Sequence, residues 1–260
     1  MKQVFLVSGP PGCGKTTWAL KTFQSHSGSR GYLRLSGDQH DGLEQGLDSG
    51  IDQAWLQDQI PNLEFHTANK DDQSESADNH LVLVELQQFM KPKTNDIEGY
   101  SDSVKQQLQA YQLSPTEFLH FGSHSDLPKE DTLEFSTLEA WQLNLRESVW
   151  DPSSLSSFWF ELVNGAYGDI YRAKALMNLP DGRSFFCNWM VSREGSQFLP
   201  LEEISPPTGR PKRHSELVVQ GKSLKPIAIQ ATINDCLLSD EVLEMQQQQL
   251  RDSMTASQPA

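Results

Sequence analysis

The fold is decided by the stretch VFLVSGPPGCGKT, residues 4–16. Residues 4–7 form a continuous apolar run, which is typical of a strand buried on both faces of a parallel sheet. Residues 9–16 match the phosphate-loop pattern G-x-x-x-x-G-K-[ST] at every fixed position. A helix is predicted from Lys15 to about Gln24, so the motif has the strand–loop–helix context that it requires.

Each position of this motif has a physical role in holding a nucleotide. Glycines let the backbone turn sharply and bring its N–H groups against phosphate oxygens, and the helix N-terminus favours the same anion. Lys15 reaches the β- and γ-phosphates, and the Thr16 hydroxyl ligates Mg²⁺. Cys13 is expected to contribute its backbone N–H, the alternative being a reactive thiol. The predicted nucleotide-binding residues of this segment are Gly9, Pro10, Pro11, Gly12, Cys13, Gly14, Lys15, Thr16 and Thr17.

A phosphate-loop enzyme also needs an acidic side chain at the tip of a neighbouring strand, to hold Mg²⁺ or its water shell. Glu85 follows the apolar run 81–84 and is the first candidate, as a catalytic and metal-binding residue. Asp38, in Ser36-Gly37-Asp38, is a second candidate for orienting the attacking water. Both have an ordinary alternative, because Glu85 could be a solvated strand end and Asp38 a turn residue.

The first half of the chain, which contains this motif, alternates strand and helix signals. Such alternation indicates βαβ units and a parallel sheet. We therefore predict an α/β P-loop NTPase domain over residues 1–130, with Lys15 and Thr16 in its nucleotide-binding site. The expected strands after the first are 32–35, 81–84 and 117–121, and the expected helices after the first are 51–60 and 98–113.

The second half has a different pattern, and we predict a small α+β domain over residues 136–238. Trp141, Leu143 and Leu145 alternate with polar residues, Asp151 can cap a helix over 152–164, and Asp181-Gly182 is a strong hairpin signal. The remaining expectations are strands over 170–179, 184–191 and 216–220, a loop over 192–214, a helix over 224–238 and a low-complexity tail over 245–260.

Composition limits the possible partners. The 260 residues carry 21 basic and 35 acidic side chains, a net charge of −14, which disfavours nucleic acid and anionic membranes. The three cysteines form no disulfide framework and no CxxC pair, so no structural zinc is expected. No apolar run reaches the length of a signal or membrane segment, and a cytoplasmic protein is expected.

Three stretches of the chain resemble the CobW-like P-loop GTPases, relatives of the HypB and UreG metallochaperones. They are VFLVSGPPGCGKTTWAL, then LVLVELQQFMKP, then LVNGAYGDIYRAKALMNL with SELVVQGKSLKPIAIQATINDCLL. The resemblance implies that residues 136–238 form a CobW C-terminal-like domain. It also implies GTP with Mg²⁺ as the ligand, slow hydrolysis and a link to metal homeostasis; ATP is not excluded.

The chain departs from that family at several places, one of which is Ala175 in place of the glycine of its Arg-x-Lys-Gly strand. It has no cysteine where the family carries Cys-x-Cys-Cys, Gln88 stands in place of a glycine that senses the γ-phosphate, and only Asp126 remains of the Asn-Lys-x-Asp guanine motif. Asp126 either accepts the guanine N–H groups or is a solvated loop residue. These departures place hydrolysis and metal delivery in question.

Two other functions stay open: a nucleotide-dependent scaffold that binds a protein client without hydrolysis, and a P-loop small-molecule kinase, for which no basic lid is evident. His120 and His124 have the spacing H-x₃-H but are expected on a strand and loop, where that spacing does not build a metal site. A basic cluster in the 192–214 loop is expected to be solvated or to contact an acidic partner; its members are Arg210, Lys212 and Arg213.

Overall fold

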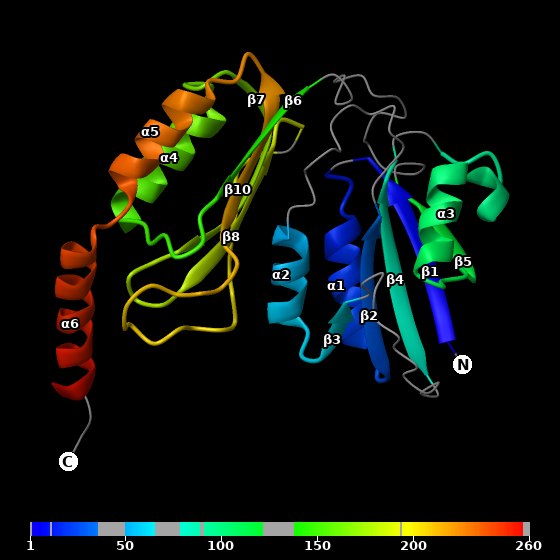
Figure 1. Cartoon of the computed structure of the whole chain (residues 1–260), viewed down its shortest axis with the longest axis horizontal. Coiled ribbons are helices and arrows are strands. Elements are labelled where there is room, and N and C mark those ends of the chain that lie inside the picture. The colour runs from blue at the N-terminus through cyan, green and yellow to red at the C-terminus, as the bar shows by residue number, and fades with distance from the viewer. Residues whose placement is uncertain are drawn as a thin grey trace. The chain divides into compact units, whose positions relative to one another are not determined.

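The computed structural model describes residues 2–10, 12–35, 50–65, 79–88, 91–121, 138–192 and 194–256. The chain folds as two compact units (Figure 1). The parallel unit comprises residues 1–48 and 59–137, and the antiparallel unit comprises residues 49–58 and 138–260.

The parallel unit is built on a five-stranded sheet in the order β3-β2-β4-β1-β5, in which every pair is parallel. This confirms the predicted α/β class with a parallel sheet. The three-residue strand β3 was not expected, because it is too short to show any periodicity. The strands are β1 (Lys2–Gly9), β2 (Ser29–Leu35), β3 (Leu63–Phe65), β4 (His80–Gln87) and β5 (Glu117–His120).

Helices pack on this sheet through apolar stripes. Helix α1 (Lys15–Ser25) buries Ala19 and Phe23, and helix α3 (Asp102–Ala110) joins Val104 and Leu108 to the apolar residues of the strands. The single helix predicted over 98–113 is instead a short 3₁₀ turn, η1 (Ile97–Gly99), followed by α3.

The break between η1 and α3 has a local cause. The Asp96 side chain accepts the Glu98 N–H at the start of the 3₁₀ turn, and the Ser101 hydroxyl accepts the Val104 N–H at the start of α3. Short polar side chains that bond the backbone in this way begin a helix and interrupt one that would run through them.

The register of β1 and β4 brings two predicted site elements together. Val7 lies opposite Glu85 and Gly9 opposite Gln87, and the Gln88 N–H donates to the Gly9 carbonyl at 3.0 Å. In a parallel sheet all carboxyl ends lie at one edge, where ligands of open α/β folds bind. The phosphate loop and Glu85 therefore share that edge.

The antiparallel unit has a second five-stranded sheet, in the order β6-β10-β7-β8-β9. Strand β9 lies within the stretch predicted to be a loop, and that prediction was wrong for four residues. They are exposed and pair only with β8 as an edge strand, so they lack the apolar alternation that marks a strand in sequence. The strands are β6 (Glu139–Asn144), β7 (Asp169–Asn178), β8 (Ser184–Met190), β9 (Gln197–Pro200) and β10 (Glu216–Lys222).

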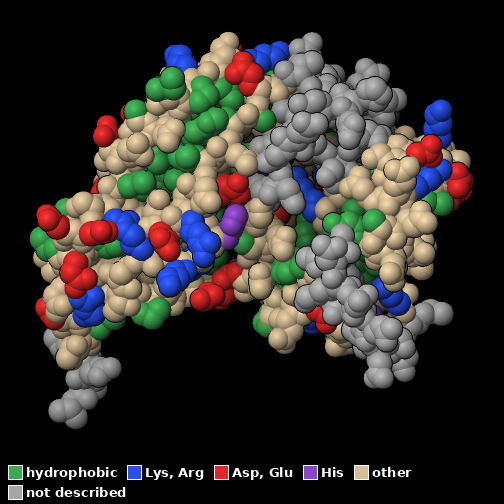
Figure 2. Space-filling model, in the orientation of Figure 1, with side chains coloured by type: hydrophobic (Ala, Val, Ile, Leu, Met, Phe, Trp, Pro, Cys, Tyr) green, Lys and Arg blue, Asp and Glu red, His purple; other side chains and the backbone are tan. Residues whose placement is uncertain are grey.

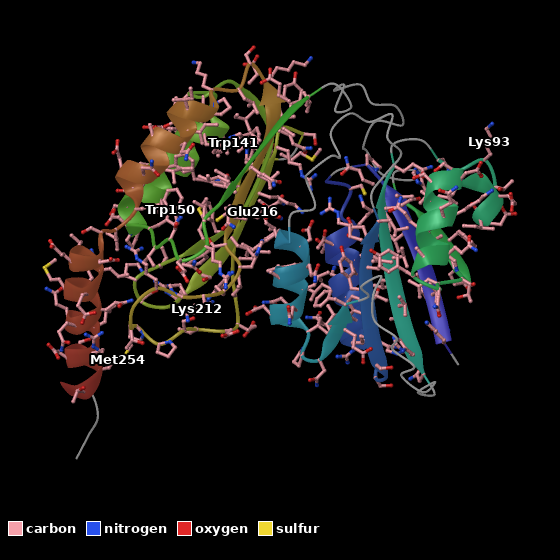
Figure 3. The ribbon with its side chains drawn as sticks, viewed as in Figure 1. Lys93, Trp141, Trp150, Lys212, Glu216 and Met254 are labelled. Carbon is pink, nitrogen blue, oxygen red and sulfur yellow. The ribbon has the colours of Figure 1, made fainter. Side chains whose placement is uncertain are left out.

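Helices α4 (Pro152–Val163) and α5 (Pro226–Cys236) lie side by side against one face of this sheet (Figure 1). The Asp151 carboxylate accepts the Ser154 N–H at 2.8 Å, as its predicted capping role requires. Trp150 is fully buried next to α4, with its ring 5.2 Å from that of Phe158 (Figure 3).

The chain ends in helix α6 (Asp240–Ala256), which occupies most of the stretch predicted to be a low-complexity tail. Gln247 explains why this glutamine-rich segment is ordered. Its side chain is buried, accepts the Gly209 N–H at 2.7 Å and donates to the Gly209 carbonyl at 2.9 Å. No helix among the described residues has the length and apolar character needed to cross a membrane.

Helix α2 (Ile51–Gln59) follows β2 in sequence, and we expected it to belong to the first domain. Residues 49–58 instead pack with the antiparallel unit. Asp52 pairs with Lys174 of β7 at 2.5 Å, and the Trp55 ring stacks on Phe186 of β8 at 5.0 Å. Buried charge pairing and aromatic stacking hold this helix, and neither could be assigned from the periodicity of the helix itself.

Candidate functional site

The phosphate loop connects β1 to α1 and requires glycine at three of its positions. Gly9, Gly12 and Gly14 have φ angles of 151°, 72° and 95°, which side-chain-bearing residues rarely adopt. A Cβ atom on Gly9 would lie 2.9 Å from both Cys13 Sγ and Phe121 Cβ. The glycines of the motif are thus explained by backbone geometry and by close packing.

Helix α1 begins at this loop with Gly14 as its N-cap residue and no side-chain cap. The first N–H groups of a helix have no partner within the helix, and the helix dipole favours an anion there. An N-terminus that follows a glycine loop and lacks a side-chain cap is suited to binding phosphate.

Lys15 crosses the loop and is buried, with an exposed fraction of 6%. Its Nζ donates to the carbonyl oxygens of Gly9 at 2.8 Å and Pro10 at 3.0 Å, and lies 3.6 Å from Cys13 Sγ. It also lies 3.9 Å from Oε1 of Glu85. The ammonium is therefore held mainly by the two backbone carbonyl oxygens, and its contact with the Glu85 carboxylate is longer than a hydrogen bond.

Glu85 lies within β4, two residues before its last residue Gln87, and not after the end of the strand as predicted; it is 8% exposed. The Tyr32 hydroxyl, on β2, donates to Glu85 Oε2 at 2.9 Å. The two carboxylate oxygens thus have different neighbours: Oε2 accepts from a phenol, and Oε1 faces Lys15. Tyr32 was not singled out from sequence, since a tyrosine in a strand gives no signal beyond strand propensity.

A second polar group lies on the opposite face of the sheet, the face covered by α3. The Ser8 hydroxyl lies 2.9 Å from His120 Nδ1 and 3.3 Å from the Tyr100 hydroxyl, and it is fully buried. Burial chiefly lowers the pKa of His120, and the positive charges of Lys15 and Lys91 lower it further. This contact joins the carboxyl ends of β1 and β5, where Ser8 lies opposite His120.

Aromatic side chains brace the start of α1. The Trp18 ring lies 6.0 Å from that of Phe5 on β1 and 5.8 Å from that of Phe121, just beyond β5. Phe121 also packs against Gly9, so the end of β5, the loop and α1 form one packed region. This packing fixes the direction in which α1 leaves the loop.

The donor set around Lys15 suits magnesium better than a soft metal. Glu85 supplies carboxylate oxygens and Thr16 a hydroxyl, which are the hard ligands that Mg²⁺ prefers together with phosphate oxygens and water. Among the residues that the structure describes, no three His, Cys, Asp or Glu side chains are grouped as a metal site would need. Of the other predicted site residues, Pro11, Asp38 and Asp126, with His124, lie outside the described residues.

No protein-family description and no curated protein matches the chain. The chain is similar to the solved structure of the Zn(II)-bound YjiA GTPase from E. coli, with 11% identity, a TM-score of 0.32, and coverage of 90% of this chain and 98% of that one. A Zn(II)-bound triple mutant of YjiA GTPase gives the same identity and TM-score over 91% and 99% of the two chains. Similarity at this level establishes no shared ligand or activity.

Proposed function

We propose that the chain binds a Mg²⁺–nucleoside triphosphate, with GTP as the ligand, and hydrolyses it slowly. The observation that carries the proposal is the phosphate loop with Lys15 at its centre and Glu85 on the adjoining strand. Three glycines with positive φ, an uncapped helix N-terminus and a buried ammonium at one sheet edge form a site for a polyphosphate.

Lys15 is the residue assigned to the transferred phosphate. It exchanges the Gly9 and Pro10 carbonyls for β- and γ-phosphate oxygens, and with the loop N–H groups it stabilises the charge that develops there. Thr16 and Glu85 hold the magnesium ion, which when bound neutralises phosphate charge. Asp38 would position the attacking water and Asp126 would bind the guanine base; both lie outside the described residues.

Binding is tested first with fluorescent GTP and ATP analogues. Lys15→Ala and Thr16→Ala should abolish binding or weaken it at least about tenfold, because a charge-assisted contact contributes roughly 1.5–3 kcal/mol. Lys21→Ala is the matched control, since Lys21 is an exposed lysine of the same helix. If Lys15→Ala binds the triphosphate as tightly as the parent, the loop is not the site.

The base is tested by competition between GTP and ATP. Two hydrogen bonds from guanine to the Asp126 carboxylate predict at least a tenfold preference for GTP, which Asp126→Asn should remove. Equal affinity of the parent for the two nucleotides would leave a generic triphosphate site.

A scaffold that binds nucleotide without turnover is the second candidate. Apolar side chains remain exposed over α4 and α5, among them Phe160 at 67% and Ile227 at 87%, and such side chains suit a protein client (Figure 2). Phosphate release separates the two proposals, because binding without release favours the scaffold. Transfer of phosphate to a small acceptor would instead favour a kinase.

The link to metal homeostasis rests on the sequence resemblance alone. Cys187 is buried, and burial raises the pKa of its thiol, which opposes the thiolate that zinc needs. We therefore propose that the reduced chain has no tight thiolate site. A stoichiometric Co²⁺–thiolate absorption band with submicromolar affinity, with or without GTP, would contradict this and restore metal delivery as a function.

A further inference from the structure

Glu85 is held by a residue that the phosphate-loop motif does not include. We propose that Tyr32 is a positioning residue: its hydroxyl fixes one oxygen of Glu85 so that the other is directed to the phosphate loop, for Mg²⁺ or its water shell. The inference rests on the proposed function, because it concerns the same magnesium–nucleotide site.

The sheet places the two residues where they can meet. Tyr32 pairs with Leu83 and Arg34 with Glu85 in the parallel register of β2 and β4, so both side chains project from the same face. The ring of Tyr32 is 2% exposed and makes an edge contact with Phe65 of β3 at a centroid distance of 6.3 Å. A ring anchored in this way holds its hydroxyl at a fixed point.

The two oxygens of Glu85 are separated in function by their neighbours. Oε2 accepts the Tyr32 hydroxyl at 2.9 Å, whereas Oε1 is 3.9 Å from Lys15 Nζ. Lys15 in turn bonds the Gly9 and Pro10 carbonyls, so its contact with Oε1 is loose. Oε1 is therefore the oxygen that faces the nucleotide site.

A phenol suits this role better than a basic side chain would. An ionised carboxylate only accepts hydrogen bonds, and a buried one must be supplied with donors. An arginine or lysine in place of Tyr32 would bring a second positive charge that competes with Mg²⁺ for the carboxylate. A tyrosine donates to one oxygen without adding a further positive charge beside Glu85.

The test is Tyr32→Phe, which keeps the ring and its contact with Phe65 and removes only the hydroxyl. Fluorescent-nucleotide binding is measured as a function of Mg²⁺ concentration and again in EDTA. We expect the Mg²⁺ concentration for half-maximal binding to rise about tenfold, equivalent to 1.4 kcal/mol, with unchanged affinity in EDTA.

Tyr100→Phe is the matched control, because it removes a buried tyrosine hydroxyl that contacts Ser8 on the other face of the same sheet; Tyr100 itself follows η1. It should leave the Mg²⁺ dependence unchanged. In a Glu85→Gln background, Tyr32→Phe should add little, since the carboxylate that it orients is gone.

Three outcomes would overturn the inference. Tyr32→Phe could match the parent in Mg²⁺ dependence, or could weaken binding equally in Mg²⁺ and EDTA, and either would show that the hydroxyl has no role in orienting Glu85. A parent protein that binds no nucleotide under any condition would overturn the proposed function, and the inference with it. The first two outcomes leave the proposed function standing, so the failures are distinguishable.

Discussion

The two units each bury a lysine, and they use it differently. In the parallel unit Lys15 is bonded to two backbone carbonyls and lies 3.9 Å from Glu85. In the antiparallel unit Lys174 is bonded to both oxygens of Asp52, at 2.5 and 2.8 Å. A buried cation with a close carboxylate is neutralised and holds the fold together, whereas one held by neutral oxygens at the edge of a sheet can accept an anion.

The surroundings of the two lysines agree with this difference. Lys174 lies on β7 under α2, over the Phe186 ring at 5.5 Å, and its charge is directed at a helix of its own unit. Lys15 lies at the first residue of α1, at the end of a parallel sheet where ligands of such folds bind. Position in the fold therefore distinguishes a lysine that is paired within its own unit from one that lies where an anion could bind.

The largest expected effect comes from removing the structural cation. Lys174→Met should lower the free energy of unfolding by about 3–5 kcal/mol, because Asp52 loses the cation that neutralises it in a buried place. Urea unfolding followed by tryptophan fluorescence reports this directly, since five of the six tryptophans belong to the antiparallel unit: Trp55, Trp141, Trp150, Trp159 and Trp189.

Lys15→Met is the comparison variant for that experiment. It should cost only about 1 kcal/mol of stability, the net worth of ordinary hydrogen bonds, while abolishing nucleotide binding. Equal losses of stability in Lys174→Met and Lys15→Met would remove the distinction between the two lysines.

The next largest effect is a partial recovery of stability in a double variant. Asp52→Asn combined with Lys174→Met removes both charges, so the loss should be smaller than the sum of the single losses by more than about 1 kcal/mol. Simple additivity in the same urea experiment would mean that the two side chains act independently and that α2 is held by other contacts.

A smaller effect tests how the two units begin a helix. Helix α4 is capped by Asp151, whereas α1 has no side-chain cap. Asp151→Ala should cost about 1 kcal/mol of stability, and Asp151→Asn should retain most of it, because asparagine caps nearly as well. If Asp151→Asn lost as much stability as Asp151→Ala, the aspartate charge and not the capping hydrogen bond would be the source of the stabilisation.

The smallest effect concerns pH and the parallel unit. Burial is the first cause that lowers the pKa of both His80 and His120 below 6.5, so the unfolded chain binds protons more readily than the folded one. The contribution of these two histidines to stability should therefore be constant above pH 6.5 and be lost as pH drops below it. The unfolding temperature of His120→Gln should depend less steeply on pH across that range than that of the parent. An unchanged slope would show that His120 does not contribute to the pH dependence of stability.

Local sequence was enough to predict the features of this chain that depend on residues close together in sequence. The eight residues of the phosphate loop specify their own backbone, because glycine alone tolerates the φ angles of Gly9, Gly12 and Gly14. The apolar runs before the loop and before Glu85 predicted two buried parallel strands, and Asp151 with Pro152 predicted the start of α4. In each case the residues that carry the sequence pattern belong to the same strand, loop or helix that the pattern predicts.

Contacts between residues far apart in sequence are seen only in the tertiary structure. Tyr32 and Glu85 are 53 residues apart, Ser8 and His120 are 112 apart, and Asp52 and Lys174 are 122 apart. Their contacts follow from strand order, register and the packing of α2 on the second sheet, none of which local periodicity encodes. The sequence thus predicted a phosphate loop, and the fold brings Tyr32 to Glu85 and Asp52 to Lys174.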